Sequence, residues 1–553
     1  MTPPQSDPPD SAPPEHARPG LAAPVRRTPR LARAFATVGG WTMASRILGF
    51  VRDVTIAALL GAGPAAQAFV AAFTLPNLFR RFFAEGAFNT AFVPMFARRL
   101  EAEGPDAARE FAETAMAALA AVLLALTLLA QLAMPWLVLA LTAGFAGDER
   151  LPLAVEMGRV AFPYILFISL AALLSGVLNS LGRFAAAAAA PVLLNLILIG
   201  ALALAATGAL EDVVGLKTPA ANGHAAAMLT WGVSLAGIAQ LALVWRAAAR
   251  AGMPLRLRRP RFTPALGRLA AVALPAALAG GVMQINLVVG RQAASFFEGA
   301  VAWLYYADRL YQLPLGVIGV AVGVVLLPEL ARRAQAGDHA GAREAANRSA
   351  EFALALTLPA AVALAAVPGP LVEVLFARGA FGPEDARATA LAVAIYGLGL
   401  PAFVLQKIYQ PLFFAREDTR TPFRCALWGM GVNAAAALGL APVIGFTAAA
   451  WATTLSAWLV LALLIRAARV FGDEGRIDAR LSRRLPRLAL ASLGMGALCL
   501  GLEAALAAPL ALPGWRWAAL GALVAGGAAG YGALAWGLGA LRPAELKAAL
   551  RRG

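Results

Sequence analysis

Apolar runs of helix length recur along almost the whole chain and leave no room for a soluble domain between them. A membrane-spanning helix needs roughly 20 apolar residues to cross a hydrocarbon core of about 30 Å. Of the 553 residues, 60% are hydrophobic and 14% are charged, far from the roughly 25% charged residues of a soluble domain. The sequence therefore predicts an all-α polytopic membrane protein.

The runs predict about fourteen spans. The first two score poorly on hydropathy because arginines interrupt them. The expected spans are 34–60, 68–97, 111–142, 151–181, 184–208, 222–248, 265–297, 301–331, 349–368, 386–415, 421–442, 445–465, 488–508 and 517–541.

The distribution of basic residues predicts the orientation in the membrane. Most of the 47 Lys and Arg lie in the N-terminal tail, in the loops after even-numbered spans and at the C-terminus. Because positively charged loops stay in the cytoplasm, both termini are expected there, and the net charge of +16 needs no nucleic acid to explain it. Residues 1–33 lack the apolar core of a signal peptide and are interpreted as a disordered cytoplasmic tail, with a second tail at 542–553.

A cluster of arginines inside the spans carries the functional prediction. An arginine at the centre of a span costs about 2.5 to 3.5 kcal/mol, so several in neighbouring spans indicate a wet cavity. Snorkelling or structural ion pairing is the alternative, and we favour it for the isolated Arg159, Arg291 and Lys407. The clustered residues are Arg46, Arg52, Arg80, Arg81 and Arg309, with Asn77 beside them and Asp53, Glu85 and Asp308 as the nearby acids.

Five cations against three acids leave net positive charge, which favours an anion as ligand. The planar guanidinium can donate two parallel hydrogen bonds to a phosphate and stays charged at any relevant pH. We therefore predict that these arginines and Asn77 bind a phosphate-bearing substrate, with Asp53, Glu85 and Asp308 as supporting ion-pair partners. No catalytic residue, metal site or cofactor is predicted, and the coupling ion stays open.

Three sequence blocks closely resemble the MurJ family, also called MviN. They are Ser45 to Asp53 (SRILGFVRD), Leu75 to Phe88 (LPNLFRRFFAEGAF) and Tyr305 to Leu310 (YYADRL). The resemblance extends over about residues 34–541. It implies the fold of the multidrug, oligosaccharidyl-lipid and polysaccharide exporter superfamily, with two six-helix lobes around a central cationic cavity and two additional C-terminal helices.

The resemblance divides the chain into an N-lobe (34–248), a C-lobe (265–465) and a C-terminal helix pair (488–541). It also implies the function, a lipid II flippase of the bacterial inner membrane in peptidoglycan biosynthesis, in which the arginines at 46, 52 and 309 are essential. The expected partners are lipid II, the bilayer and other cell-wall synthesis proteins. Many members have an acidic residue where this chain has Gln67 and Gln312, which puts proton transfer through those positions in doubt.

Three alternatives stay open. A multidrug antiporter of the same superfamily would need buried carboxylates to bind cationic cargo, the opposite of the charge seen here. An O-antigen or capsule lipid-oligosaccharide flippase shares the pyrophosphate anchor and differs only in the family blocks. An enzyme acting on polyprenyl phosphates would need a nucleophile or metal centre, and His16, His224 and His339 have no paired carboxylate motif beside them.

Overall fold

The computed structural model of the chain describes residues 29–80, 87–208, 210 and 221–541. Every regular element among these residues is a helix. Ten helical segments there are long and apolar enough to cross a membrane. Four further long segments occupy the remaining expected spans: α1, α2 together with α3, α10 and α11. The predicted all-helical polytopic fold is confirmed.

The first group of helices contains the segments that precede residue 251. Their bounds are α1 Pro29–Leu60, α2 Pro64–Arg80, α3 Ala87–Ala102, α4 Pro105–Leu141, α5 Arg150–Ala161, α6 Tyr164–Ser180, α7 Ala185–Ala205 and α9 Gly223–Arg250, with the short 3-10 helix η2 at Ala143–Phe145.

The second group follows, with a helix pair at its end. Its bounds are α10 Pro264–Ser295, α11 Ala300–Gln335, α12 His339–Ala366, α13 Pro368–Phe376, α14 Pro383–Phe414, α15 Arg420–Ile444 and α16 Thr447–Ala468, then the 3-10 helix η3 Arg469–Gly475, α17 Ala479–Ala505, α18 Ala507–Ala511 and α19 Arg516–Gly537.

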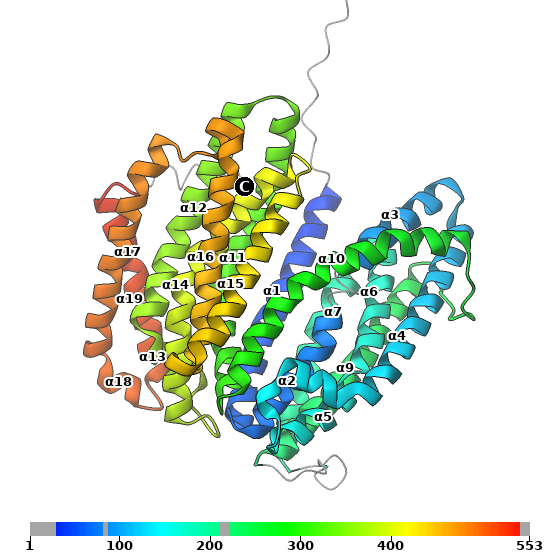
Figure 1. The fold of residues 1–553 in the computed structure, drawn as a ribbon, viewed down its shortest axis with the longest axis horizontal. Helices are drawn as coiled ribbons and strands as arrows, with labels where there is room; N and C mark the ends of the chain where they lie inside the picture. Colours follow the sequence, from blue (N-terminus) through cyan, green and yellow to red (C-terminus); the bar gives the residue numbers. More distant parts are fainter. Residues whose placement is uncertain (1–28, 81–86, 209, 211–220, 542–553) are drawn as a thin grey trace, which may run out of the picture.

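The two groups converge at one end of the molecule and separate toward the other (Figure 1). Helix α1 packs mainly on α7, and α10 runs between the groups, contacting α3 and α4 of the first and α15 and α16 of the second. We call the end that carries segments 61–63, 142–149, 296–299 and 377–382 the closed end. The end that carries 181–184, 251–263, 415–419 and 469–478 is the arginine-rich end.

Several helix boundaries differ from the sequence prediction. The span expected at 151–181 is two helices, because α5 ends before Pro163 and α6 begins after it; proline lacks the N–H that would continue the first helix. The segment expected at 349–368 begins ten residues earlier, at His339, where the Asp338 side chain accepts a hydrogen bond from the Gly341 N–H and caps the helix. Helix α1 begins at Pro29, inside the segment expected to be a disordered tail; the rest of that tail and the second tail, at 542–553, lie outside the described residues.

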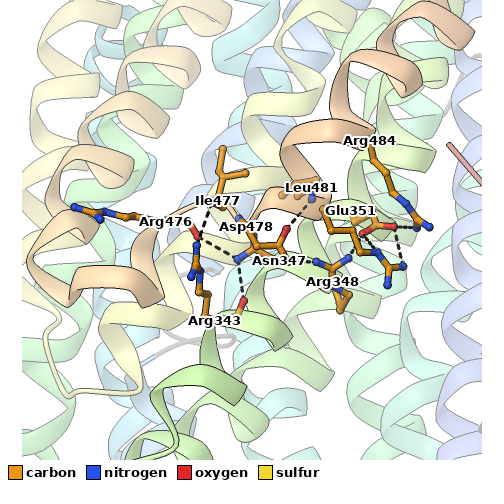
Figure 2. Close-up of polar contacts among 10 residues, drawn as sticks. Arg343, Asn347, Arg348, Glu351, Arg476, Ile477, Asp478, Leu481 and Arg484 are labelled. Atoms are coloured by element: carbon orange, nitrogen blue, oxygen red, sulfur yellow. Dashed lines mark hydrogen bonds and ion pairs between the residues drawn. The ribbon is translucent and has the colours of Figure 1, made fainter. Parts of the chain in front are cut away.

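A network of ion pairs fastens the C-terminal helix pair to the second group (Figure 2). Glu351 of α12 is only 8% exposed and contacts Arg348, Arg480 and Arg484, the last two from α17. Asp478 caps α17 by accepting the Leu481 N–H at 2.6 Å and pairs with Arg348. Partial burial disfavours the ionised form of Asp478, but these donors outweigh burial and hold its pKa below the usual value.

Candidate functional site

Adjacent residues of α1 form the centre of the site. Arg52 and Asp53 are 8% and 2% exposed, and Arg52 Nη2 lies 2.7 Å from Asp53 Oδ1. Arg52 Nη1 also donates to Asn195 Oδ1 of α7 at 2.9 Å. The Asn195 amide in turn donates to the Ser45 carbonyl at 2.9 Å. These contacts hold the Arg52 side chain in one position between α1 and α7.

The same carboxylate joins α1 to the second group of helices. Tyr305 Oη of α11 donates to Asp53 Oδ1 at 2.9 Å. Arg309 Nε lies 3.2 Å from Asp53 Oδ2, and the Arg309 guanidinium lies over the Tyr305 ring, 4.5 Å from its centroid. The Arg309 Nε–H is buried and not aligned for a hydrogen bond, so the contact with Asp53 is an ion pair only. One carboxylate therefore faces two guanidinium groups, which leaves one positive charge in excess.

Arg46 adds a further cation on α1, two turns before Asp53. Its guanidinium lies against the backbone of α11 at Gly316, where a Cβ atom would collide with it. Within the described residues, Arg46 has no hydrogen bond or ion pair, and its side chain is exposed. Arg46 therefore reaches across to the second group without a counter-ion in the part of the chain that the structure describes.

The expected residues of the second span are placed only in part. Arg80 ends α2, and its Nε donates to Asn77 Oδ1 at 3.3 Å, while the Asn77 amide donates to the Phe73 carbonyl at 2.9 Å. Arg81 and Glu85 lie outside the described residues. No described contact joins Arg80 or Asn77 to Asp53.

Asp308, one of the three acids expected near the arginines, accepts a hydrogen bond within its own helix. The Gln312 amide, one turn further along α11, donates a hydrogen bond to Asp308 Oδ2. The nearest carboxylate oxygen to Arg309 Nε belongs to Asp53, and the charge of Asp308 also acts on Arg309. The side-chain amide of Gln312 can always donate a hydrogen bond to the Asp308 carboxylate. An acidic residue at position 312 could donate such a bond only when protonated.

Backbone contacts close the gap between the groups at the closed end. Tyr306 Oη donates to the Gly61 carbonyl at 2.8 Å, and the Ala380 N–H donates to the Ala58 carbonyl at 2.8 Å. Gly61 and Gly379 have φ of +63° and +56°, and a Cβ at either would collide with the facing backbone. Glycine is required there both for the left-handed conformation and for the close approach.

A second set of contacts at this end centres on Arg150. Its guanidinium donates to the Ser295 carbonyl at 3.2 Å, the Gly144 carbonyl at 3.1 Å and Gln67 Oε1 at 3.2 Å. Ser295 Oγ accepts the Gly144 N–H at 2.9 Å. Gln67 is fully buried, and its amide N–H groups have no partner among the described residues.

Sequence reasoning missed Asn195 and Arg150 as parts of this arrangement. Asn195 is a lone polar residue in an apolar helix, which is a detectable signal for a buried hydrogen bond. Arg150 sits at the start of α5, in a segment expected to be an ordinary loop, and nothing in its sequence neighbourhood marks it. Within the described residues, no group of three or more His, Cys, Asp or Glu is arranged to hold a metal ion.

The comparisons with known proteins identify the family and agree with the fold. The model of the family "Lipid II flippase MurJ" matches residues 56–506. The chain belongs to the MurJ family. A probable lipid II flippase MurJ of Rhizobium meliloti (strain 1021) is 47% identical over 531 residues, covering 95% of this chain and 97% of the relative. The lipid II flippase MurJ of Burkholderia cenocepacia is 36% identical over 424 residues, covering 75% and 79%.

Solved structures support the fold. A lipid II flippase MurJ in an inward closed conformation superposes with a TM-score of 0.74 at 22% identity, over 90% of this chain and 97% of that one. An inward-facing multidrug resistance transporter of the MATE family, in the MOP superfamily, superposes with a TM-score of 0.64 at 15% identity, over 80% and 99%. The MurJ family and the multidrug transporters therefore share one architecture, as the sequence resemblance implied, and the expectation of a transporter rather than an enzyme is confirmed by the family.

Proposed function

We propose that this chain flips lipid II from the cytoplasmic to the periplasmic leaflet of the inner membrane by alternating access. The observation that carries the proposal is the excess of cations where the two helix groups meet. Arg52 and Arg309 share the Asp53 carboxylate at that position, Asp308 adjoins Arg309, and Arg46 has no ion-pair partner among the described residues, so these three cations outnumber the two acids. A pyrophosphate diester supplies about two negative charges and several acceptor oxygens, which matches this excess.

The ion pair across the groups suggests how binding is coupled to movement. Asp53 bridges to Tyr305 and Arg309 in the conformation that is shut at the closed end. A pyrophosphate entering from the arginine-rich end competes with Asp53 for Arg309 and offers Arg46 its missing counter-ion. Weakening the Asp53 bridge favours opening of the closed end, which in our proposed orientation faces the periplasm.

The charge of the site argues against cationic cargo. A multidrug antiporter that binds cations would place them next to uncompensated guanidinium groups, where like charges repel. An O-antigen or capsule lipid also carries a pyrophosphate, so the charge of the site does not distinguish a flippase for such a lipid from a lipid II flippase. Only the family membership argues against that alternative.

Complementation of a flippase-depleted strain tests the proposal. Wild-type chain is expected to restore growth, while Arg46→Ala, Arg52→Ala and Arg309→Ala are expected to insert in the membrane and fail. Lys at these positions is expected to rescue only partly, because it lacks the planar fork. Arg159→Ala, which removes an arginine from α5 whose Nε donates to the Gln131 carbonyl, is a matched control and should grow normally. Normal growth with all three site variants would contradict the role of the arginines.

A further inference from the structure

A separate pocket lies within the first helix group, at its arginine-rich end. It has a volume of about 890 Å³ and lies where the start of α1, the end of α6, the start of α7 and the end of α9 meet. All of its lining residues precede residue 252, so no residue of the second helix group contributes to it. None of the residues that carry the proposed substrate site lines it.

Three arginines line this pocket without an acidic neighbour. Arg246 and Arg250 are one turn apart on the last turns of α9, and Arg183 comes from the tight turn between α6 and α7. None of the three guanidinium groups has a hydrogen bond or ion pair to any residue that the structure describes. All three side chains are exposed, and like charges one turn apart on a helix repel by roughly 0.2–0.5 kcal/mol, which a bound anion would relieve.

The turn between α6 and α7 and the N-terminus of α7 also favour binding of an anion in the pocket. Gly182 has φ +71° and the Arg183 N–H donates to the Leu178 carbonyl at 2.8 Å, which sets the direction of the turn. No side chain caps the N-terminus of α7, and Ala185 and Ala186 of its first turn line the pocket. Their N–H groups and the positive end of the helix dipole face the same space as the arginines.

Apart from Thr37, the rest of the lining is apolar, with Leu178, Phe184 and Leu243 among its members. A free inorganic anion gains nothing from such a surface, whereas the glycerol and first acyl carbons of a lipid do. Basic pockets between transmembrane helices at the cytoplasmic side are the usual sites for anionic lipid headgroups.

We propose that this pocket binds the phosphate headgroup of an anionic phospholipid from the leaflet at the arginine-rich end. Arg183, Arg246 and Arg250 contact the phosphate, and the apolar residues contact the glycerol region. The site is distinct from that of the transported lipid and does not rest on the proposed flippase function.

The test measures binding of phosphatidylglycerol to the purified full chain by native mass spectrometry, with phosphatidylcholine as the neutral reference. The test variant combines Arg183→Gln, Arg246→Gln and Arg250→Gln. The matched control combines Arg259→Gln, Arg261→Gln and Arg268→Gln, which removes the same charge from exposed arginines at the same end, outside the pocket. The test variant is expected to bind phosphatidylglycerol roughly a hundredfold more weakly and the control to bind as wild type.

A second variant distinguishes a loss of lipid binding from misfolding of the protein. Ala185→Glu places a carboxylate at the uncapped N-terminus of α7, where a negative charge favours the helix. It is expected to keep the lipid-free thermal midpoint and to lose phosphatidylglycerol binding, because the new carboxylate occupies the site. Retained binding in both pocket variants would overturn the proposal.

Three other outcomes would also overturn it. Equal loss in the test and control variants would show general surface attraction. Saturable binding of pyrophosphate or inorganic phosphate that displaces the lipid equally well would show an anion site that is not specific to lipid. Displacement of phosphatidylglycerol from the pocket by lipid II at equal concentration would assign the pocket to the transported substrate.

Discussion

Asp53 of α1 and Arg309 of α11 form an ion pair, with 3.2 Å between Oδ2 and Nε, that joins the two groups of helices. Asp53 also pairs with Arg52 on its own helix, so Arg309 receives only part of the negative charge. The bridge is therefore one that a doubly charged pyrophosphate could displace. In our account, this competition couples substrate binding to the relative movement of the two groups.

The glycines at the closed end give a prediction about conformation. Gly61→Ala and Gly379→Ala each put a Cβ against the facing backbone and a left-handed φ on a non-glycine residue, at a cost of roughly 1–2 kcal/mol. Both variants are expected to open the closed end five- to thirtyfold more often. The measurement is maleimide labelling of Ser295→Cys, which is fully buried in the structure, with Cys425 and Cys499 replaced by Ala.

Gly63→Ala is the matched control for this experiment, since a Cβ there meets nothing within 4 Å. It should label at the wild-type rate. Equal labelling of Gly61→Ala, Gly379→Ala and wild type would show that the close backbone approach does not hold this end shut.

The ion pairs around Glu351 give a prediction about stability. Glu351→Gln leaves Arg348, Arg480 and Arg484 without their shared carboxylate, and breaking such a buried network costs about 3–5 kcal/mol. The thermal midpoint is expected to fall, and amide exchange of α17 to rise. Glu344→Gln removes an exposed carboxylate from the same helix and should change neither.

The expected spans follow from local hydropathy, which is why most of them were predicted from the sequence alone. Helix α15 at Arg420–Ile444, for example, lies within a few residues of the predicted 421–442. The arginine cluster was also visible, because a charge in an apolar run is costly wherever it occurs. The ion pair across the helix groups was not visible, because the approach of Asp53 to Arg309 depends on how α1 and α11 pack. The hydrogen bond from Gln312 to Asp308 is local, but the sequence analysis did not name it.

The orientation of the chain is a further prediction from the basic loops. Reporter fusions after residues 100, 260 and 470 are expected to report the cytoplasm, and a fusion after residue 380 the periplasm. A periplasmic signal from any of the first three would contradict the topology.

The membrane potential is expected to favour export. A pyrophosphate carries about two negative charges, and each charge crossing 100 mV is worth about 2.3 kcal/mol, so outward movement gains on the order of 4 to 5 kcal/mol across the full field. Collapsing the potential with valinomycin and potassium while the pH gradient is held should reduce the lipid II that appears in the outer leaflet. Undiminished flipping would exclude this drive, and loss on collapsing only the pH gradient would indicate proton coupling.

In the proposed function, the arginines between the helix groups bind lipid II while it crosses the membrane. The most direct measurement is translocation of lipid II in proteoliposomes that contain only the purified chain. Wild-type chain is expected to move lipid II between leaflets, and the Arg309→Ala substitution is expected to abolish this movement. The thermal midpoint of Arg309→Ala should differ from that of wild type by no more than the midpoint of the Arg159→Ala control does. Translocation by Arg309→Ala at the wild-type rate, or no translocation by a folded wild-type chain, would contradict the proposed role of these arginines.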